Sequence, residues 1–343
     1  MNARQKIGID PQLRRAASLA KRKYLLAKHP APKYASRLVS AHPGHNVVGV
    51  GIGFKKIEGE TTETACVRLY VRNKFGNRVI SKKHRLPKTI DGIVTDIIEV
   101  GTPRRSAITD PDTAPRLRPA RPGCMVETDS DFGFLTPGTF GALLQDADGN
   151  VYILSANHVL AQENMNAKGS DVYQPSNDSP KNKIAKLATF FPLDPSGSNK
   201  VDCALAKVIQ PSDVNPIPIE PMSPLSGATP VDPVLGMTVQ KIGIATDCTT
   251  GTVSAIAAHF RVDGYMTAND NGMLFEDQIE IEDGPEPFCA HGDSGSLVVD
   301  AASKQAVGLL AVRLKTSGLA NRMSNVLSAL SKELNSDLEL KIS

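Results

Sequence analysis

The sequence lacks most of what marks an exported or membrane-bound chain. Its 343 residues contain no apolar run long enough to cross a membrane, and the first residues after Met1 lack the apolar core of an export signal. The cysteines, at positions 66, 124, 203, 248 and 289, are odd in number and lie far apart, and their spacing indicates no metal site. These absences predict a cytoplasmic protein without a membrane span, a metal or a cofactor.

A nucleotide-binding fingerprint is also missing. Residues 48–53 read Val-Gly-Val-Gly-Ile-Gly, which resembles such a motif at first sight. The run lacks a third glycine at the required spacing and a following helix, so a nucleotide site is disfavoured. We expect these glycines to allow another backbone or element to pack closely against the strand.

The small net charge of +3 conceals an uneven distribution. Residues 1–121 contain 25 Lys and Arg against 9 Asp and Glu, whereas residues 122–343 contain 14 against 27. A basic amphipathic helix is predicted over residues 10–28, with Asp10 as N-cap and Pro11 in the first turn. Its apolar face favours docking within the chain or self-assembly. Binding to nucleic acid or to an acidic membrane surface stays open, although the helix has few aromatic side chains to stack on bases.

Composition divides the chain into four parts. The many short apolar runs, with 27 glycines and 24 prolines, favour a mainly β protein. We expect a basic helical segment at 1–39, a small α+β unit at 40–101, a Pro- and Arg-rich linker at 102–122, and a β-rich domain at 123–343. Within the α+β unit, strands are expected at 46–54, 64–73 and 92–100.

Three short motifs in the β-rich part contain the side chains that acyl transfer to a hydroxyl nucleophile requires. They are Ser-Ala-Asn-His at 155–158, Val-Asp-Cys-Ala-Leu at 201–205 and His-Gly-Asp-Ser-Gly-Ser at 291–296. In such chemistry a serine loses its proton to a histidine, which a carboxylate orients. The candidates are His158, Asp202 and Ser294. Their order differs from the orders found in α/β-hydrolases and in subtilisins, which disfavours both classes.

The local context suits each of these residues. An apolar strand over 151–156 would present His158 at its end, and Asp202 begins another strand. The glycines on either side of Ser294 indicate a turn just before a further strand. Such a turn can direct the amides of Gly292 and Ser294 at one point, as an oxyanion hole requires.

These motifs resemble those of the chymotrypsin-like serine peptidases. More narrowly, the chain is similar to the bacterial and plant narrow-leaf-type trypsin-like proteins, which carry an N-terminal accessory domain. The segments that support the resemblance, besides the three motifs, are 46–53, 87–96, 138–143, 240–243, 249–253, 307–310 and 318–321. The resemblance implies two six-stranded antiparallel β-barrels with a C-terminal helix, preceded by a small α+β domain and a basic helix.

The resemblance also implies roles for residues near the nucleophile. The substrate-binding positions are Phe288, His291, Ala311, Val312 and Arg313. Phe288 stands where the floor of the primary pocket usually lies. Because it is not acidic, we expect poor cleavage after Lys and Arg and a preference for small or apolar residues. Arg313 aligns with the pocket wall, where it would narrow the pocket or favour an acidic group.

Activation cannot follow the usual route of the family. There the residue before the nucleophile, here Asp293, pairs with a new N-terminus after zymogen cleavage, and this chain has no Ile-Val-Gly-Gly-like start. Assembly, the N-terminal domain or a partner would then have to shape the oxyanion hole.

The sequence therefore predicts a cytoplasmic serine endopeptidase that acts on a protein or peptide substrate. A homo-oligomer or a regulatory protein partner would control it. Two alternatives stay open. One is a catalytically silent scaffold that binds peptides along residues 311–313. The other is a nucleic-acid-associated protein that uses the basic N-terminal half.

Overall fold

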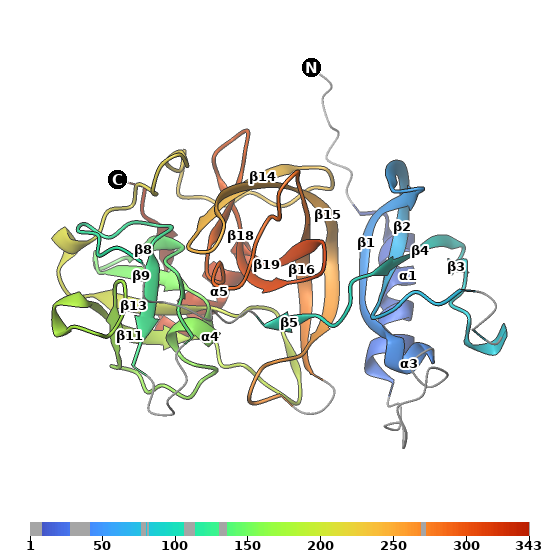
Figure 1. The fold of residues 1–343 in the computed structure, drawn as a ribbon, viewed down its shortest axis with the longest axis horizontal. Helices are drawn as coiled ribbons and strands as arrows, with labels where there is room; N and C mark the ends of the chain where they lie inside the picture. Colours follow the sequence, from blue (N-terminus) through green and yellow to red (C-terminus); the bar gives the residue numbers. More distant parts are fainter. Residues whose placement is uncertain are drawn as a thin grey trace.

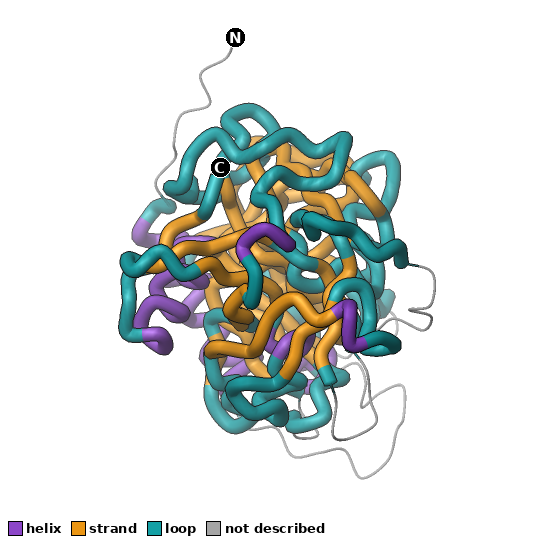
Figure 2. Tube along the Cα trace, turned by 90° about the vertical axis from the view of Figure 1, so that its left-hand side faces the viewer, coloured by secondary structure: helices purple, strands orange, loops and turns teal. Residues whose placement is uncertain are grey.

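The computed structural model describes residues 9–27, 42–76, 80, 82–105, 114–129, 136–268 and 272–342. Strands dominate, and the helices and most loops lie around them (Figures 1 and 2). The helices are α1 (Pro11–Lys21), α3 (Pro43–Asn46), α4 (Asn157–Leu160) and α5 (Met323–Leu334). Other helical segments are η1 (Arg22–Leu26), which directly continues α1, and the three-residue turns η2 (Lys82–His84), η3 (Pro180–Asn182) and η4 (Pro211–Asp213). Among the described residues, no helix is long and apolar enough to cross a membrane.

The first barrel is a closed antiparallel sheet. Its strands are β6 (Met125–Thr128), β7 (Gly138–Thr139), β8 (Ala142–Asp146), β9 (Val151–Ser155), β10 (Asp171–Tyr173), β11 (Lys183–Phe190) and β13 (Ala204–Val208). They pair in the order β8-β9-β13-β11-β10-β6-β7. Only Phe140 and Gly141 separate β7 from β8, and both residues continue the backbone hydrogen bonding, to Cys124 and Leu154. The two pieces therefore act as one strand, and the sheet closes with six strands.

The second barrel closes directly. Its strands are β14 (Thr238–Gly243), β15 (Asp247–Val262), β16 (Met273–Asp283), β17 (Leu297–Asp300), β18 (Ala306–Arg313) and β19 (Ser317–Arg322). They pair in the order β16-β19-β18-β17-β14-β15, and β15 also pairs with β16. A short strand, β12 (Ser198–Asn199), adds to β16 in parallel. The two six-stranded barrels and the C-terminal helix confirm the predicted fold class.

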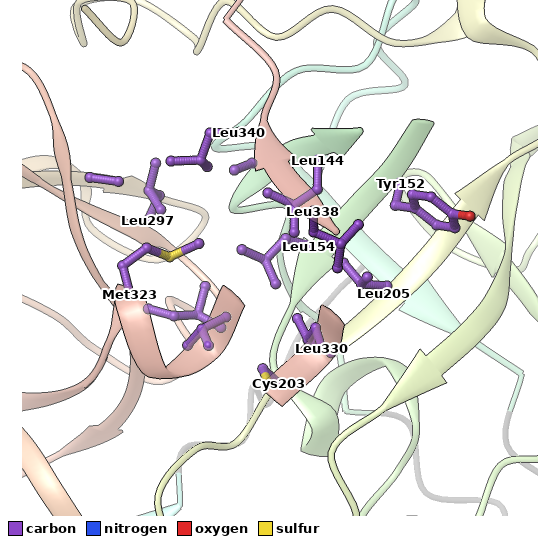
Figure 3. Close-up of a cluster of buried hydrophobic side chains, with 14 of the residues drawn as sticks. Leu144, Tyr152, Leu154, Cys203, Leu205, Leu297, Met323, Leu330, Leu338 and Leu340 are labelled. Carbon is purple, nitrogen blue, oxygen red and sulfur yellow. The ribbon is translucent and has the colours of Figure 1, made fainter. Parts of the chain in front are cut away.

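The C-terminal part of the chain fills the space between the barrels. Helix α5 packs its apolar side against leucines of the first barrel, and β20 (Leu338–Leu340) pairs with β8 (Figure 3). Leu297 of the second barrel joins the same cluster. The labelled members in Figure 3 are Leu144, Tyr152, Leu154, Cys203, Leu205, Leu297, Met323, Leu330, Leu338 and Leu340. This shared core holds the two barrels together.

The N-terminal unit is a small sheet covered by one helix. Its strands are β1 (Val47–Ile57), β2 (Glu60–Val71), β3 (Thr89–Ile90) and β4 (Ile93–Glu99), close to the expected ranges. Asp10 caps α1 by accepting a hydrogen bond from the Gln12 amide, as expected. The helix buries Leu13 and its alanines against this sheet, whereas Leu19 stays 40% exposed. The apolar face is thus docked within the chain. The rest of the basic segment predicted at 1–39, residues 1–8 and 28–39, lies outside the described residues.

The N-terminal sheet is continuous with the second barrel. Strand β1 pairs antiparallel with β15, for example Gly49 with Phe260. A Cβ atom at Gly49 would lie 2.6 Å from the Phe260 ring, and one at Gly53 would lie 2.5 Å from Arg68 Nε. These distances are too short for any side chain, which confirms that the glycines allow close packing.

A buried ionic cluster strengthens this junction. The Glu280 carboxylate of β16 accepts hydrogen bonds from Arg68 at 3.0 Å and from the Tyr70 hydroxyl at 2.6 Å, both on β2. Ser254 and Ser317 of the barrel donate to the same carboxylate. Burial and the neighbouring carboxylate raise the pKa of Tyr70 well above its ordinary value, so its hydroxyl stays a donor. The unit is therefore fastened to the barrel by a satisfied polar network as well as by strand pairing.

The segment expected as a linker, 102–122, contains ordered structure. Its residues Arg104–Arg105 form a short strand, β5, which pairs antiparallel with β18. Further along, Ala120 bridges to Val214. In Figure 1, the chain runs from the N-terminal unit to β5, which lies against the second barrel.

Candidate active site

The histidine and the aspartate come from neighbouring strands of the first barrel. Strand β9 ends at Ser155, and the single turn of α4 then presents His158. Asp202 directly precedes β13, whose Ala204 pairs with Ser155. His158 Nδ1 lies 2.6 Å from Asp202 Oδ2, and the His158 amide donates to Asp202 Oδ1 at 3.1 Å. Both side chains are fully buried. A carboxylate in this place holds the imidazole with its Nε2 directed away from the aspartate.

Two residues of the second barrel support this aspartate. The Tyr265 hydroxyl donates to Asp202 Oδ2 at 2.5 Å, and the Tyr265 ring meets the His158 ring edge-on at 5.9 Å. Asn321 of β19 accepts from the Asp202 amide at 3.1 Å. Burial opposes ionisation, but the neighbouring His158 and these hydrogen bonds hold the pKa of Asp202 below its ordinary value. The carboxylate is therefore charged at neutral pH.

The candidate nucleophile lies in a turn that the second barrel presents to the first. The Ser294 carbonyl accepts from the Thr139 amide of β7 at 2.8 Å. The next residue, Gly295, has φ +89°, and a Cβ there would lie 2.1 Å from Ser155 Oγ. Only glycine fits so tight a contact, so the turn sits directly against the barrel that carries His158.

Some backbone amides of this turn donate hydrogen bonds within the chain, and others do not. The amides of Asp293, Gly295 and Ser296 each donate to a backbone carbonyl. Within the described ranges, the amides of Gly292 and Ser294 have no acceptor. Gly292 has φ +107°, a conformation that glycine adopts at little cost. Two free amides beside a serine hydroxyl are suited to hold an oxyanion.

The serine and the imidazole are not hydrogen-bonded to each other here. Ser294 Oγ donates to the Ala311 carbonyl of β18 at 3.3 Å. In the part of the chain that the structure describes, His158 Nε2 has no hydrogen-bond partner and is buried. A buried nitrogen without a partner is costly, so this atom is available to bind a proton donor.

Asp293 anchors the turn through a fully buried ion pair. Its Oδ2 lies 3.1 Å from Lys241 Nζ of β14, and both side chains are 0% exposed. The carboxylate also accepts from Thr246 Oγ1 at 2.6 Å and from the amides of Ala245 and Ala290, each at 2.9 Å. An internal lysine thus supplies the positive charge that the buried Asp293 carboxylate needs.

The expected substrate-binding residues lie in different environments. Phe288 is fully buried in the core of the second barrel, where its ring lies against Gly251. His291 is exposed beside Gly292. Arg313 ends β18 and makes a two-pronged ion pair with Asp283, so its charge is neutralised within the chain. The remaining two, Ala311 and Val312, are buried in β18.

Cys289 stands beside these residues but is poorly suited to react. The side chain is 2% exposed, and burial raises the pKa of its thiol to about 12. It is therefore protonated at neutral pH and packs as a small apolar residue.

Sequence reasoning missed Tyr265, Asn321 and Lys241. Tyr265 and Asn321 meet Asp202 only because the two barrels close against each other, and no local pattern marks them. Lys241 could have been suspected. A lysine inside a barrel strand needs a buried anion, and Asp293 lacked an evident cation.

Comparisons with solved structures return chymotrypsin-like serine proteases. A glutamic-acid-specific serine protease is 16% identical, with a TM-score of 0.45 over 65% of this chain and 100% of that one. Protease A of Thermobifida fusca is 14% identical, with a TM-score of 0.43 over 65% and 100%. The chymotrypsin of Cellulomonas bogoriensis is 16% identical, with a TM-score of 0.41 over 65% and 98%. No family model and no curated protein matches the chain. The strand order of the two barrels defines a trypsin-like fold in its own right.

The Tyr265 hydroxyl offers a test of how Asp202 is positioned. We expect Tyr265→Phe to lower kcat roughly tenfold and to leave KM unchanged, because the substitution removes a hydrogen bond to the charged Asp202 carboxylate and no group that would bind the substrate. The measurement is steady-state hydrolysis of a small-residue peptide ester. Tyr173→Phe is the matched control, since the Tyr173 hydroxyl donates to the remote carboxylate of Asp129. Equal effects of the two substitutions would show that Tyr265 has no special role.

Proposed function

We propose that this protein is a serine endopeptidase that hydrolyses peptide bonds through an acyl-enzyme. The observation that carries the proposal is the buried pair of His158 and Asp202, 2.6 Å apart, on the barrel against which the Ser294 turn is hydrogen-bonded. A nucleophile, a base and an orienting carboxylate are the parts that this chemistry needs.

The proposed steps are those of acyl transfer through a serine hydroxyl. Ser294 Oγ leaves its bond to the Ala311 carbonyl and attacks the carbonyl carbon of the substrate, while His158 Nε2 takes its proton. Asp202 holds the proton on Nδ1 and stabilises the imidazolium that forms. The imidazolium then protonates the leaving amine. A water molecule, activated by the same imidazole, hydrolyses the ester and restores Ser294.

The free amides of Gly292 and Ser294 would bind the oxyanion of each tetrahedral intermediate. Their positions depend on the conformation of the turn, which Asp293 fixes through its bond to Lys241. Preorganised donors of this kind commonly contribute about 10²–10³ in rate each. We therefore assign to Lys241 the task of keeping the turn in its reactive shape without a cleavage step.

The residues near the site favour small or apolar side chains in the substrate. Phe288 offers no charge, and Arg313 is already paired with Asp283. A Lys or Arg side chain would find no counter-ion here, and burying it unpaired is costly. The substrate is thus a protein or peptide cut after small or apolar residues, with poor cleavage after basic ones.

The proposal includes a cytoplasmic location and control by contact. All of the chain's cysteines are free thiols, and all but Cys248 are buried. Free thiols suit a reducing compartment. The N-terminal unit is fastened to the second barrel by strand pairing and by the Glu280 cluster, so it is placed to influence the site. A homo-oligomer or a regulatory partner would act through that unit.

Covalent labelling by a fluorophosphonate probe tests the proposal. The wild-type protein, with reductant at neutral pH, is expected to be labelled, and Ser294→Ala to lose the label entirely. Ser196→Ala, which removes an exposed hydroxyl, is the matched control and should be labelled like wild type. A well-folded wild type that takes up no label, and that cleaves no unfolded protein substrate, would favour a silent peptide-binding scaffold.

A further inference from the structure

The edge of β18 next to the nucleophile is already occupied by the chain itself. Strand β17 pairs with β18 only as far as Leu309. Beyond that point β19 covers one side of β18, and β5 covers the other. The pairing is antiparallel, with Val312 opposite Arg105 and Arg313 opposite Arg104. Without β5, this edge of β18 would be free, and a free strand edge is where an extended peptide can add as a further strand.

The pairing of β5 with β18 begins one residue away from the β18 residue that contacts Ser294. The residue before Val312 is Ala311, whose carbonyl accepts the Ser294 hydroxyl at 3.3 Å. Because the strands are antiparallel, the chain from Arg104 to Arg105 advances toward Ala311 and thus toward the nucleophile. The resemblance to chymotrypsin-like peptidases implies that a substrate binds along residues 311–313.

The segment that carries β5 is held on both sides. The Pro103 carbonyl accepts from the Asp263 amide of the second barrel at 2.8 Å. The Thr102 hydroxyl accepts from Arg72 of the N-terminal unit at 2.7 Å, and Arg72 also pairs with Asp263 at 3.2 Å. Residues 102–105 are therefore fixed where the N-terminal unit meets the barrel (Figure 1).

The side chains of His158 and Ser294 are almost inaccessible to solvent. The His158 side chain is 0% exposed and Ser294 is 4% exposed. A substrate has to reach both groups, because one attacks its carbonyl and the other protonates its leaving amine. The two groups are thus little exposed in this arrangement of the site.

We propose that β5 is an internal pseudosubstrate. It takes the place of the substrate backbone on β18 and so blocks the binding of extended peptides. Movement of the N-terminal unit, to which residues 102–105 are tied through Arg72, would withdraw it. The catalytic consequence of this inference rests on the proposed peptidase function, whereas the occupancy of β18 does not. Control by contact would then need no cleavage of the chain.

Two double substitutions in the full-length chain distinguish the effect of β5 pairing with β18 from the effect of the two arginine charges. Arg104→Pro with Arg105→Pro removes both amide donors of β5, so the strand can no longer form its ladder. Arg104→Ala with Arg105→Ala removes the same charges and keeps the donors, which makes it the matched control. Each is made both with Ser294 intact and in the Ser294→Ala background.

Binding is measured in the Ser294→Ala background with a fluorescent, N-acetylated tetrapeptide of small apolar residues. Fluorescence anisotropy should show at least tenfold tighter binding to the proline pair than to the parent, and the alanine pair should stay within about threefold of the parent. With Ser294 intact, kcat/KM for an ester of the same tetrapeptide should rise at least tenfold in the proline pair. An ester of a single residue, which does not reach β5, should change by less than threefold.

The outcomes distinguish the two proposals. Equal peptide binding by the parent and both pairs would overturn the pseudosubstrate. An equal gain in peptide affinity in the alanine and proline pairs would also overturn it. Tighter binding to the proline pair, without hydrolysis or fluorophosphonate labelling of any Ser294-containing protein, would support occupancy of β18 and refute the peptidase function. If the parent hydrolyses the tetrapeptide ester and the proline pair does so with the same kcat/KM, the result would support the peptidase function and refute the pseudosubstrate.

Discussion

Replacing Asp202 with asparagine is expected to lower kcat by about four orders of magnitude. The carboxylate accepts the Nδ1 proton of His158 across 2.6 Å and so leaves Nε2 free to act as a base. An asparagine amide group in this place would present a donor to Nδ1. The imidazole would then carry its proton on Nε2, and it could not accept one from Ser294.

The rest of the local structure should survive this change, except that the Tyr265 hydroxyl, which donates to the same Oδ2, would have to accept from the asparagine amide instead. The bonds between Asp202 and Asn321 involve the aspartate backbone, and an asparagine carbonyl can still accept from the His158 amide. The measurement is kcat and KM for a single-residue ester, alongside the thermal unfolding midpoint. Asp148→Asn makes the same change at an exposed turn and should leave kcat unchanged. A loss of less than tenfold in a folded Asp202→Asn protein would contradict the proposed role of this carboxylate.

Local sequence marks the three residues of the candidate site. His158 follows an apolar strand, Asp202 lies just before one, and Ser294 lies in a glycine-rich turn, so each is visible within its own segment. The many short apolar runs likewise predicted strands, whereas the pairing order that closes each sheet into a barrel joins strands far apart in the chain and is not visible in any one run. The capped basic helix was predictable because Asp10 and Pro11 mark its start.

Residues whose role depends on contacts between distant segments could not be found in this way. Tyr265 reaches Asp202 from the other barrel, and nothing near Tyr265 in the sequence marks it. Strand β5 is an extreme case. A Pro- and Arg-rich segment reads as a linker, yet Arg104–Arg105 pairs with a strand far along the chain, because that strand edge would otherwise be unpaired. Phe288 likewise packs in the core of the second barrel, through contacts that its own segment does not reveal.

Replacing Lys241 with methionine is expected to slow fluorophosphonate labelling and ester hydrolysis at least about a hundredfold. The ammonium is fully buried 3.1 Å from Asp293 Oδ2, and it also donates to Thr246 and to the Asp247 carbonyl. Without it, the Asp293 carboxylate is buried without a counter-charge. The turn would shift to expose that carboxylate to water, and the amides on either side of it would no longer point together.

The effect on stability must be separated from the effect on the site. Breaking a buried ion pair typically costs about 3–5 kcal/mol, so Lys241→Met alone should also lower the free energy of unfolding. Combining it with Asp293→Asn removes both charges and should restore most of that stability. Activity should stay low in the double variant if the ion pair itself shapes the turn. Lys207→Met, at an exposed lysine of β13, is the matched control and should match wild type in both measurements. Full labelling of a folded Lys241→Met protein would show that the turn keeps its reactive shape without the internal cation.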